Sequence, residues 1–269
     1  MRDNIFMSKF LFIVFMFTFG TVQSDELKKQ VLSSTGINLL KANKKLLFKG
    51  ITSISLNKSY RNFLSSGIPN HLVGEFPNKD NPYQITTQTY DFSVTLKPKI
   101  RKSKTALKES LYFGIALNGI PFDPQLDKWF LDKKSTGWQY EALGGAIPLG
   151  IDTNHAHVDK KGAYHYHGLP KLLLKKLGIA KGKLSPLIGY AADGFPIRAL
   201  YGLKGKPMKS SYSLKRGKRP IGGNFDGSFI QDYKYVKSSG DLDECNGKIV
   251  NGVYTCLLYT SDAADDSLR

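Results

Sequence analysis

The sequence predicts a mainly β protein, built as an antiparallel sandwich or a barrel-like pair of sheets with long loops. Apolar segments of roughly four to eight residues recur along the chain, and 26 glycines and 12 prolines punctuate them. Tyr83 to Pro98 alternates in character and is rich in Thr, Tyr and Val, which is typical of a strand. The one helix expected is a turn or two over Leu172 to Leu177. A short internal repeat also suggests a duplicated β unit.

The first 24 residues have the composition of a secretory signal peptide. Arg2 and Lys9 give a basic start, residues 10–19 form an apolar run, and Ser24 ends a stretch of small side chains suited to cleavage. The run is short for a membrane span, and no other stretch is apolar enough to cross a bilayer. We therefore expect a periplasmic or secreted protein, with an uncleaved N-terminal anchor as the alternative.

After the signal peptide, we expect an N-terminal extension over residues 25–58 and a main domain over residues 59–254. The extension has mixed helical and coil character and includes a strand-like run, Leu46 to Leu56. Residues 66–82 are dense in turn residues and predict a long ordered loop. Leu111 to Leu117 has the apolar character of a buried strand.

Two segments of the main domain are similar, Ala116 to Phe122 (ALNGIPF) and Ala192 to Ile197 (ADGFPI). Each is followed by a turn-bearing segment that ends in Gly-aliphatic-Tyr. Aligning these two turns sets Cys245 against His155. The similarity predicts a duplicated unit, and two unrelated Gly-x-Pro turns are the alternative.

Four of the five histidines form two His-x-His pairs around a turn: His155, His157, His165 and His167. In a strand, residues i and i+2 point to the same face. Asp159-Lys-Lys-Gly162 predicts a type I turn with a left-handed glycine, which sets His157 opposite His165 and His155 opposite His167. All four imidazoles would then share one face, with Tyr164 and Tyr166 on the other. A turn one residue longer would split the pairs between the faces.

Such a histidine face is suited to binding a metal ion. Cross-strand neighbours have Cβ atoms about 4.5–5.5 Å apart, so two or three ring nitrogens can reach one ion. Imidazole suits Zn, Cu, Fe or Ni, and we expect Zn or Cu. Because charged rings would repel one another, the cluster should favour neutral imidazoles. The alternative is a polar or catalytic groove in which the histidines bond to backbone and tyrosines.

The formal net charge of +17 comes mainly from lysine-rich runs near residues 97–108, 171–183 and 204–219. No nucleic-acid recognition module and no interleaved aromatic pattern accompanies this charge, so we expect no specific nucleic-acid partner. Solvated loops are one interpretation of the charge. Attraction to an anionic surface polymer is the other.

The end of the sequence changes character abruptly. Residues 255–269 are acidic, lack lysine and resemble translated sequencing-adapter sequence, so we expect them to be a non-native tail. Cys245 and Cys256 are the two cysteines, and export would permit a disulfide between them. Because Cys256 falls in the suspected tail, this pairing is in doubt.

Taken together, these segments resemble the YHYH-domain family, named after the tetrapeptide that is here residues 164–167. The matching blocks are Gly67 to His71 with Phe76-Pro-Asn and Asn81-Pro82, Leu117 to Phe122, Asn154 to His157 with Gly162 to His167, Ile188 to Ile197, and Leu242 to Gly247. The chain departs from the family pattern after Ile197, and the family's closing segment is replaced by the tail. The resemblance implies an exported β-rich domain with a shared His/Asp site and no settled reaction.

The matching blocks suggest three further site residues. His71 lies in a turn-dense block, where functional side chains are often presented, and is a fifth candidate ligand. Capping of nearby backbone is its alternative role. Asp193 and Asp152 are candidate carboxylates that could orient a metal-binding imidazole by accepting a hydrogen bond from its other ring nitrogen. Asp193 can equally accept hydrogen bonds from its own turn.

Three functions follow from these expectations. The first is an exported domain that binds a transition metal through the histidine hairpin. The second is a metal-dependent hydrolase that uses the same groove, with either a metal-activated water or a histidine held by Asp193 as base. The third is a non-catalytic surface module for anionic polymers. No Gly-x-Ser-x-Gly motif signals a serine nucleophile. An open coordination position with a water near a carboxylate would favour the hydrolase.

Overall fold

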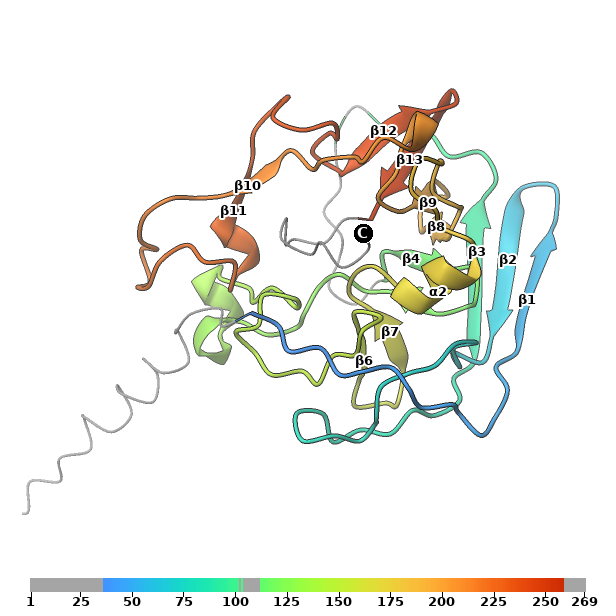
Figure 1. Cartoon of the computed structure of the whole chain (residues 1–269), viewed down its shortest axis with the longest axis horizontal. Coiled ribbons are helices and arrows are strands. Elements are labelled where there is room, and N and C mark those ends of the chain that lie inside the picture. Colours follow the sequence, from blue (N-terminus) through green and yellow to red (C-terminus); the bar gives the residue numbers. More distant parts are fainter. Residues whose placement is uncertain (1–35, 102, 104–111, 259–269) are drawn as a thin grey trace, which may run out of the picture.

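The protein, seen in a computed structural model, is described over residues 36–101, 103 and 112–258. Its largest sheet has eight strands in the order β12-β13-β9-β8-β4-β5-β7-β6 (Figure 1). Their bounds are β4 (Gly114–Ala116), β5 (Pro121–Phe122), β6 (Ala156–Val158), β7 (Tyr164–Tyr166), β8 (Gly189–Ala191), β9 (Pro196–Arg198), β12 (Gly247–Val250) and β13 (Val253–Leu257). The sheet curls like half of a barrel.

Two smaller sheets accompany it. One holds β1 (Thr52–Leu56), β2 (Tyr60–Ser65) and β3 (Tyr90–Thr95), and the other holds β10 (Tyr212–Leu214) and β11 (Tyr233–Tyr235). Figure 1 shows them on opposite sides of the large sheet. Helical structure in the described residues is limited to α2 (Lys171–Lys176) and four short 3₁₀ turns: η1 (Phe130–Asp132), η2 (Lys134–Thr136), η3 (Leu203–Gly205) and η4 (Ile230–Asp232). The mainly β prediction is confirmed.

The large sheet is mainly antiparallel, as expected, but two of its strand pairings are parallel. β5 runs parallel to β7, and β9 runs parallel to β13. Local sequence patterns predict hairpins, but they carry no signal for a parallel pairing between strands far apart in the chain. β3 also covers only the second half of the expected strand, because the earlier part follows the 159–162 turn, where Thr86 N–H donates to Gly162 O at 2.9 Å.

The sheet order shows an internal duplication. In the first half, hairpin β4–β5 is followed by hairpin β6–β7, and β7 lies parallel to β5. In the second half, hairpin β8–β9 is followed by hairpin β12–β13, and β13 lies parallel to β9. The two copies meet where β4 and β8 pair antiparallel. The predicted duplicated unit is therefore confirmed.

The strand register fixes which residues correspond, and it corrects one of our alignments. Asn246, rather than Cys245, occupies the position of His155. Both have a left-handed backbone with φ of 50°, and the carbonyl of each accepts a hydrogen bond from the second strand of its hairpin. The turn of the second hairpin is one residue shorter than the turn of the first. The nine-residue spacing from His155 to Tyr164 therefore reaches Cys245 when it is counted back from Tyr254, one residue too far.

A tyrosine–aspartate contact recurs in both copies. Tyr164 donates its hydroxyl proton to Asp152 at 2.8 Å, and Tyr254 donates to Asp243 at 3.0 Å. Asp152 is fully buried and also accepts hydrogen bonds from Gly74 N–H and Asn154 N–H. Because it occurs in both copies, this contact belongs to the scaffold of the unit.

The core lies against one face of the β6–β7 hairpin. Tyr164 and Tyr166 are fully buried there among apolar side chains such as Phe122 and Ile188. We call this side the tyrosine face. The opposite side of the same hairpin is then available for the histidines.

The boundaries of the expected domains differ from the observed elements. Residue 58 lies in the turn between the paired strands β1 and β2, and Leu40 bridges to Asp152, so the described part of the extension packs with the main domain. The expected end at Tyr254 falls inside β13, which continues through Leu257. The expected signal peptide and residues 259–269 lie outside the described residues. In the part that is described, no helix is long and apolar enough to span a membrane.

Candidate metal centre

The β6–β7 hairpin forms in the predicted register, with His157 directly opposite His165. Gly162 has φ of 79°, and its N–H closes the turn on Asp159 O at 2.9 Å. The Asp159 carboxylate accepts hydrogen bonds from the N–H groups of Lys161 and Ala163 at 2.7 and 2.9 Å. The turn therefore holds the register that the histidine face requires.

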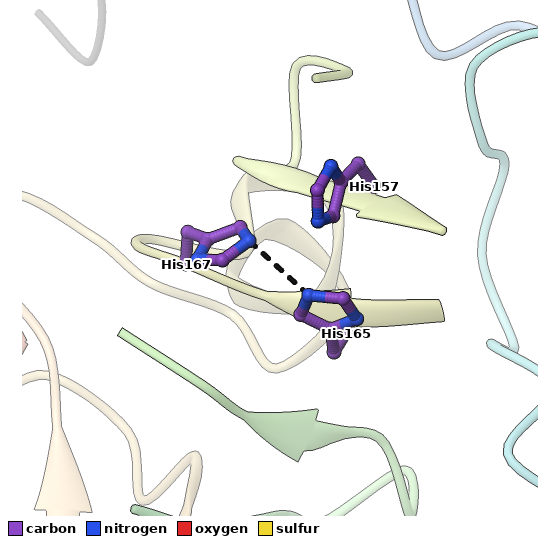
Figure 2. Close-up of side chains that lie close together, drawn as sticks. All are labelled: His157, His165 and His167. Carbon is purple, nitrogen blue, oxygen red and sulfur yellow. Dashed lines mark hydrogen bonds between the residues drawn. The ribbon is translucent and has the colours of Figure 1, made fainter. Parts of the chain in front are cut away.

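Three of the four clustered histidines converge: His157 from β6, His165 from β7, and His167 just after β7 (Figure 2). Their ring centroids are 4.7, 4.7 and 4.8 Å apart, and the ring planes are inclined at 71–77°. The Nε2 atoms of His165 and His167 are 3.2 Å apart. One ligand nitrogen from each ring lies within 4.8 Å of the others. We call these residues the histidine triad.

Backbone carbonyls orient two of these rings. His165 Nδ1–H donates to Ala163 O at 3.0 Å, and His157 Nδ1–H donates to Leu149 O at 3.2 Å. A carbonyl only accepts, so the proton of each neutral ring sits on Nδ1 and Nε2 carries the lone pair. Metal-binding histidines in proteins are commonly held in this way.

Burial keeps His157 and His167 neutral. It lowers the pKa of His157 to about 3, and repulsion from His165 adds to the effect. The pKa of His167 is also lowered, by burial first and then by His157 and His165. Neutral imidazole is the form that binds a metal ion.

The spacing suits a transition-metal ion. Two ligand nitrogens on a tetrahedral ion at about 2.0–2.1 Å are about 3.3–3.4 Å from each other, close to the 3.2 Å between His165 and His167. The third ring needs only a small shift, because all three nitrogens already lie within 4.8 Å. The triad can therefore hold a metal ion.

His155 is not part of the convergent set. Its carbonyl accepts the N–H of His167 at 2.7 Å, so the backbone pairing is as expected. Its left-handed φ of 50°, however, takes it out of the alternation of the strand, which begins at Ala156. Its ring lies instead beside Gly168. The structure therefore brings together three of the four predicted imidazoles and leaves His155 outside the set of converging ligand atoms.

His71 lies on the tyrosine face, away from the triad. Its Nε2 is 2.6 Å from the hydroxyl of Tyr166, and its Nδ1 is 2.8 Å from Leu72 O. Asn118 donates to the same tyrosine hydroxyl at 2.9 Å. The structure thus places His71 in the backbone-capping role that was its alternative.

The two candidate carboxylates are also elsewhere. Asp152 binds Tyr164 on the tyrosine face, as described above. Asp193 is exposed in the β8–β9 turn, where it accepts the N–H of Phe195 at 3.5 Å. The structure brings neither to the histidine triad.

The carboxylate that does lie near the triad is Asp123, which the sequence did not single out. Phe122 pairs with Tyr166 across the parallel strands, and their rings are 5.5 Å apart on the tyrosine face. Because side chains alternate along a strand, Asp123 points to the face of His165 and His167. Its N–H donates to Tyr166 O at 2.8 Å.

The Asp123 carboxyl is half-buried beside the triad. Burial raises the pKa of Asp123, and His165 partly offsets this rise. β5 is only two residues long, so no strand signal marked the position. The position of Asp123 directly after the family-like block Leu117 to Phe122 is the one clue that the sequence contained.

The second copy provides an internal comparison for these residues. At the positions of His157, His165, His167 and Asp123 it has Lys248, Thr255, Leu257 and Arg198. The fold of the unit therefore forms without any of the four groups. Their presence in the first copy is not explained by the scaffold.

Comparison with known proteins gives one match. A family model described as "YHYH protein" matches residues 91–264. The matched region includes the whole histidine hairpin and all eight strands of the large sheet. It also extends past Tyr254, where we had expected native sequence to end. No curated protein and no solved structure matches the chain significantly.

Proposed function

Since the chain belongs to the YHYH protein family, we propose a function from the residues of the motif itself: an exported domain that binds one transition-metal ion through His157, His165 and His167. The observation that carries the proposal is the convergence of three buried imidazoles, whose ligand nitrogens lie within 4.8 Å of one another. Export is inferred from the first 24 residues of the sequence.

The internal duplication supports a functional role for the triad. Burying three imidazoles together is costly to a fold, because their polar nitrogens lose contact with water. The second copy places Lys248 and Thr255 in the same register without loss of the hairpin. A purely structural role does not require three histidines, whereas a bound metal ion would use all three as ligands.

Zn or Cu is the ion we propose. Nitrogen ligands favour late transition metals, whereas Mg and Ca prefer sets of oxygen ligands. The nearest carboxylate is a single residue, Asp123, and it lies outside the group of converging atoms. A second candidate function, binding of an anionic surface polymer, is supported by the net charge of +17 alone.

The test is a chelator-competition titration of Zn and Cu into the mature protein, expressed without a His-tag. The variant is His157→Ala with His165→Ala, and its matched control is Lys248→Ala with Thr255→Ala, the corresponding pair of the second copy. We expect one tight site in the wild type and in the control, with at least a hundredfold loss of affinity in the histidine variant. Equal affinity in all three proteins would refute the proposal.

A further inference from the structure

The histidine triad and Asp123 together form an unsymmetrical set. Three imidazoles converge on one point, while the carboxylate stands beside them on the same face. Asp123 follows Phe122, the partner of Tyr166, and so faces the side of His165 and His167, yet its oxygens are not among the converging ligand atoms. A tetrahedral ion held by three histidines keeps one position open for water. Asp123 is therefore suited to contact that water rather than the ion.

The carboxylate is the more exposed member of this set. His157, His165 and His167 are only 5–7% exposed, whereas Asp123 is half-buried. In the second copy, Arg198 takes the place of Asp123, so the carboxylate occurs only where the histidines do. Asp123 thus belongs with the triad by its position in the sheet.

We propose that Asp123 is the general base of an open three-histidine metal site that hydrolyses carboxylic esters. The inference rests on the proposed metal site. The oxygen of the water forms a bond to the ester carbonyl carbon, and its proton passes to the Asp123 carboxylate. The bond from carbon to the alcohol oxygen then breaks, and the departing oxygen takes the proton from Asp123. No oxidant or second co-reactant is needed.

A carbonyl substrate fits the site better than a phosphate ester. Enzymes that cleave phosphate esters commonly use two ions about 3.5–4 Å apart, whereas a single ion with an open position suffices for attack at a carbonyl. Within the described residues, only one cluster of potential ligands could hold a metal. The site therefore suits single-ion chemistry.

The test compares the zinc-loaded wild type with Asp123→Asn, using 4-nitrophenyl acetate as the probe. Asp127→Asn, an exposed aspartate of the same loop, is the matched control. We expect Asp123→Asn to keep one equivalent of zinc with an affinity within tenfold of the wild type, and to hydrolyse the probe about 100-fold more slowly. Asp127→Asn should match the wild type in both.

Other results would overturn the inference in distinguishable ways. If Asp123→Asn lost zinc as completely as His165→Ala, Asp123 would be a ligand and the site closed. If the zinc-loaded wild type hydrolysed the probe no faster than the zinc-free protein, or if Asp123→Asn were as fast as the wild type, the catalytic role would be wrong while the metal site stood. A wild type without zinc affinity would overturn both proposals.

A second measurement needs no variant. Azide added to the cobalt-loaded wild type should change its visible absorption spectrum, because an open position exchanges water for the anion. An unchanged spectrum at saturating azide would indicate a closed site and would contradict the proposed role of Asp123.

Discussion

The metal-free protein should lose stability steeply in mild acid because of His157 and His167. The pKa of His157 falls to about 3 in the folded protein, from about 6.5 in the unfolded chain. Between these values the unfolded state binds more protons than the folded state. The free energy of unfolding therefore decreases as pH falls through about 6.5 towards 3.

The size of this loss of stability is set by protonation of the histidine ring in the unfolded chain. Between pH 7 and pH 5, protonation of one such ring stabilises the unfolded chain by about 2 kcal/mol, while a folded-state pKa near 3 leaves the folded ring neutral. The pKa of His167 is lowered in the same direction, so this residue adds to the loss. The two together should remove more than about 2 kcal/mol, a large part of the stability of an ordinary domain.

The assay is urea unfolding at pH 7 and at pH 5 with a metal chelator present. The wild type is compared with a variant carrying His157→Gln and His167→Gln, and with the control Lys248→Ala, Thr255→Ala. We expect the pH-dependent loss to be at least about 2 kcal/mol smaller in the glutamine variant than in the other two proteins. If all three lost stability equally within about 1 kcal/mol, the two histidines would not be buried and neutral, and the reasoning would be refuted.

Three further perturbations separate scaffold from site. Tyr164→Phe removes a donor from a fully buried carboxylate and should lower the free energy of unfolding by about 1–3 kcal/mol without changing zinc affinity; loss of zinc would contradict the division between the two faces. His155→Ala and His71→Ala should each keep one equivalent of zinc by elemental analysis, and a zinc-free protein from either variant would restore that residue to the ligand set. Gly162→Ala places a Cβ against the Thr86 hydroxyl at a left-handed position, so it should lower the melting temperature and weaken zinc binding through loss of register; a variant with wild-type melting and affinity would show that the turn does not control the site.

The parts of the fold that were predictable are local in sequence. The 159–162 turn and the alternation of the two His-x-His pairs are encoded within about a dozen residues, and the register of His157 and His165 followed from them. The duplicated unit was visible because its turns repeat the same Gly and Pro pattern. The parallel pairing of β5 with β7 was not predictable, because it joins a two-residue strand to a partner far along the chain.

In the candidate site, too, only the features that are local in sequence were predictable. Three of the histidines converge because the alternation of the strand dictates it, whereas His155 deviates at a left-handed residue that no local signal marked. Asp193 and Asp152 were chosen because they lie near the motifs in the sequence. In the structure, Asp193 accepts a hydrogen bond within its own turn, and Asp152 accepts one from Tyr164. Asp123 reaches the triad only through the parallel strands, so its role depended on the three-dimensional pairing.

Elemental analysis tests the central claim most directly. The mature protein, expressed without a His-tag, is measured before and after mild chelation, beside the His157→Ala, His165→Ala variant. We predict one equivalent of zinc or copper in the wild type, its removal by chelation, and none in the variant. A wild type that holds no transition metal, even after reconstitution, would contradict the account and leave the triad as a histidine face without an ion.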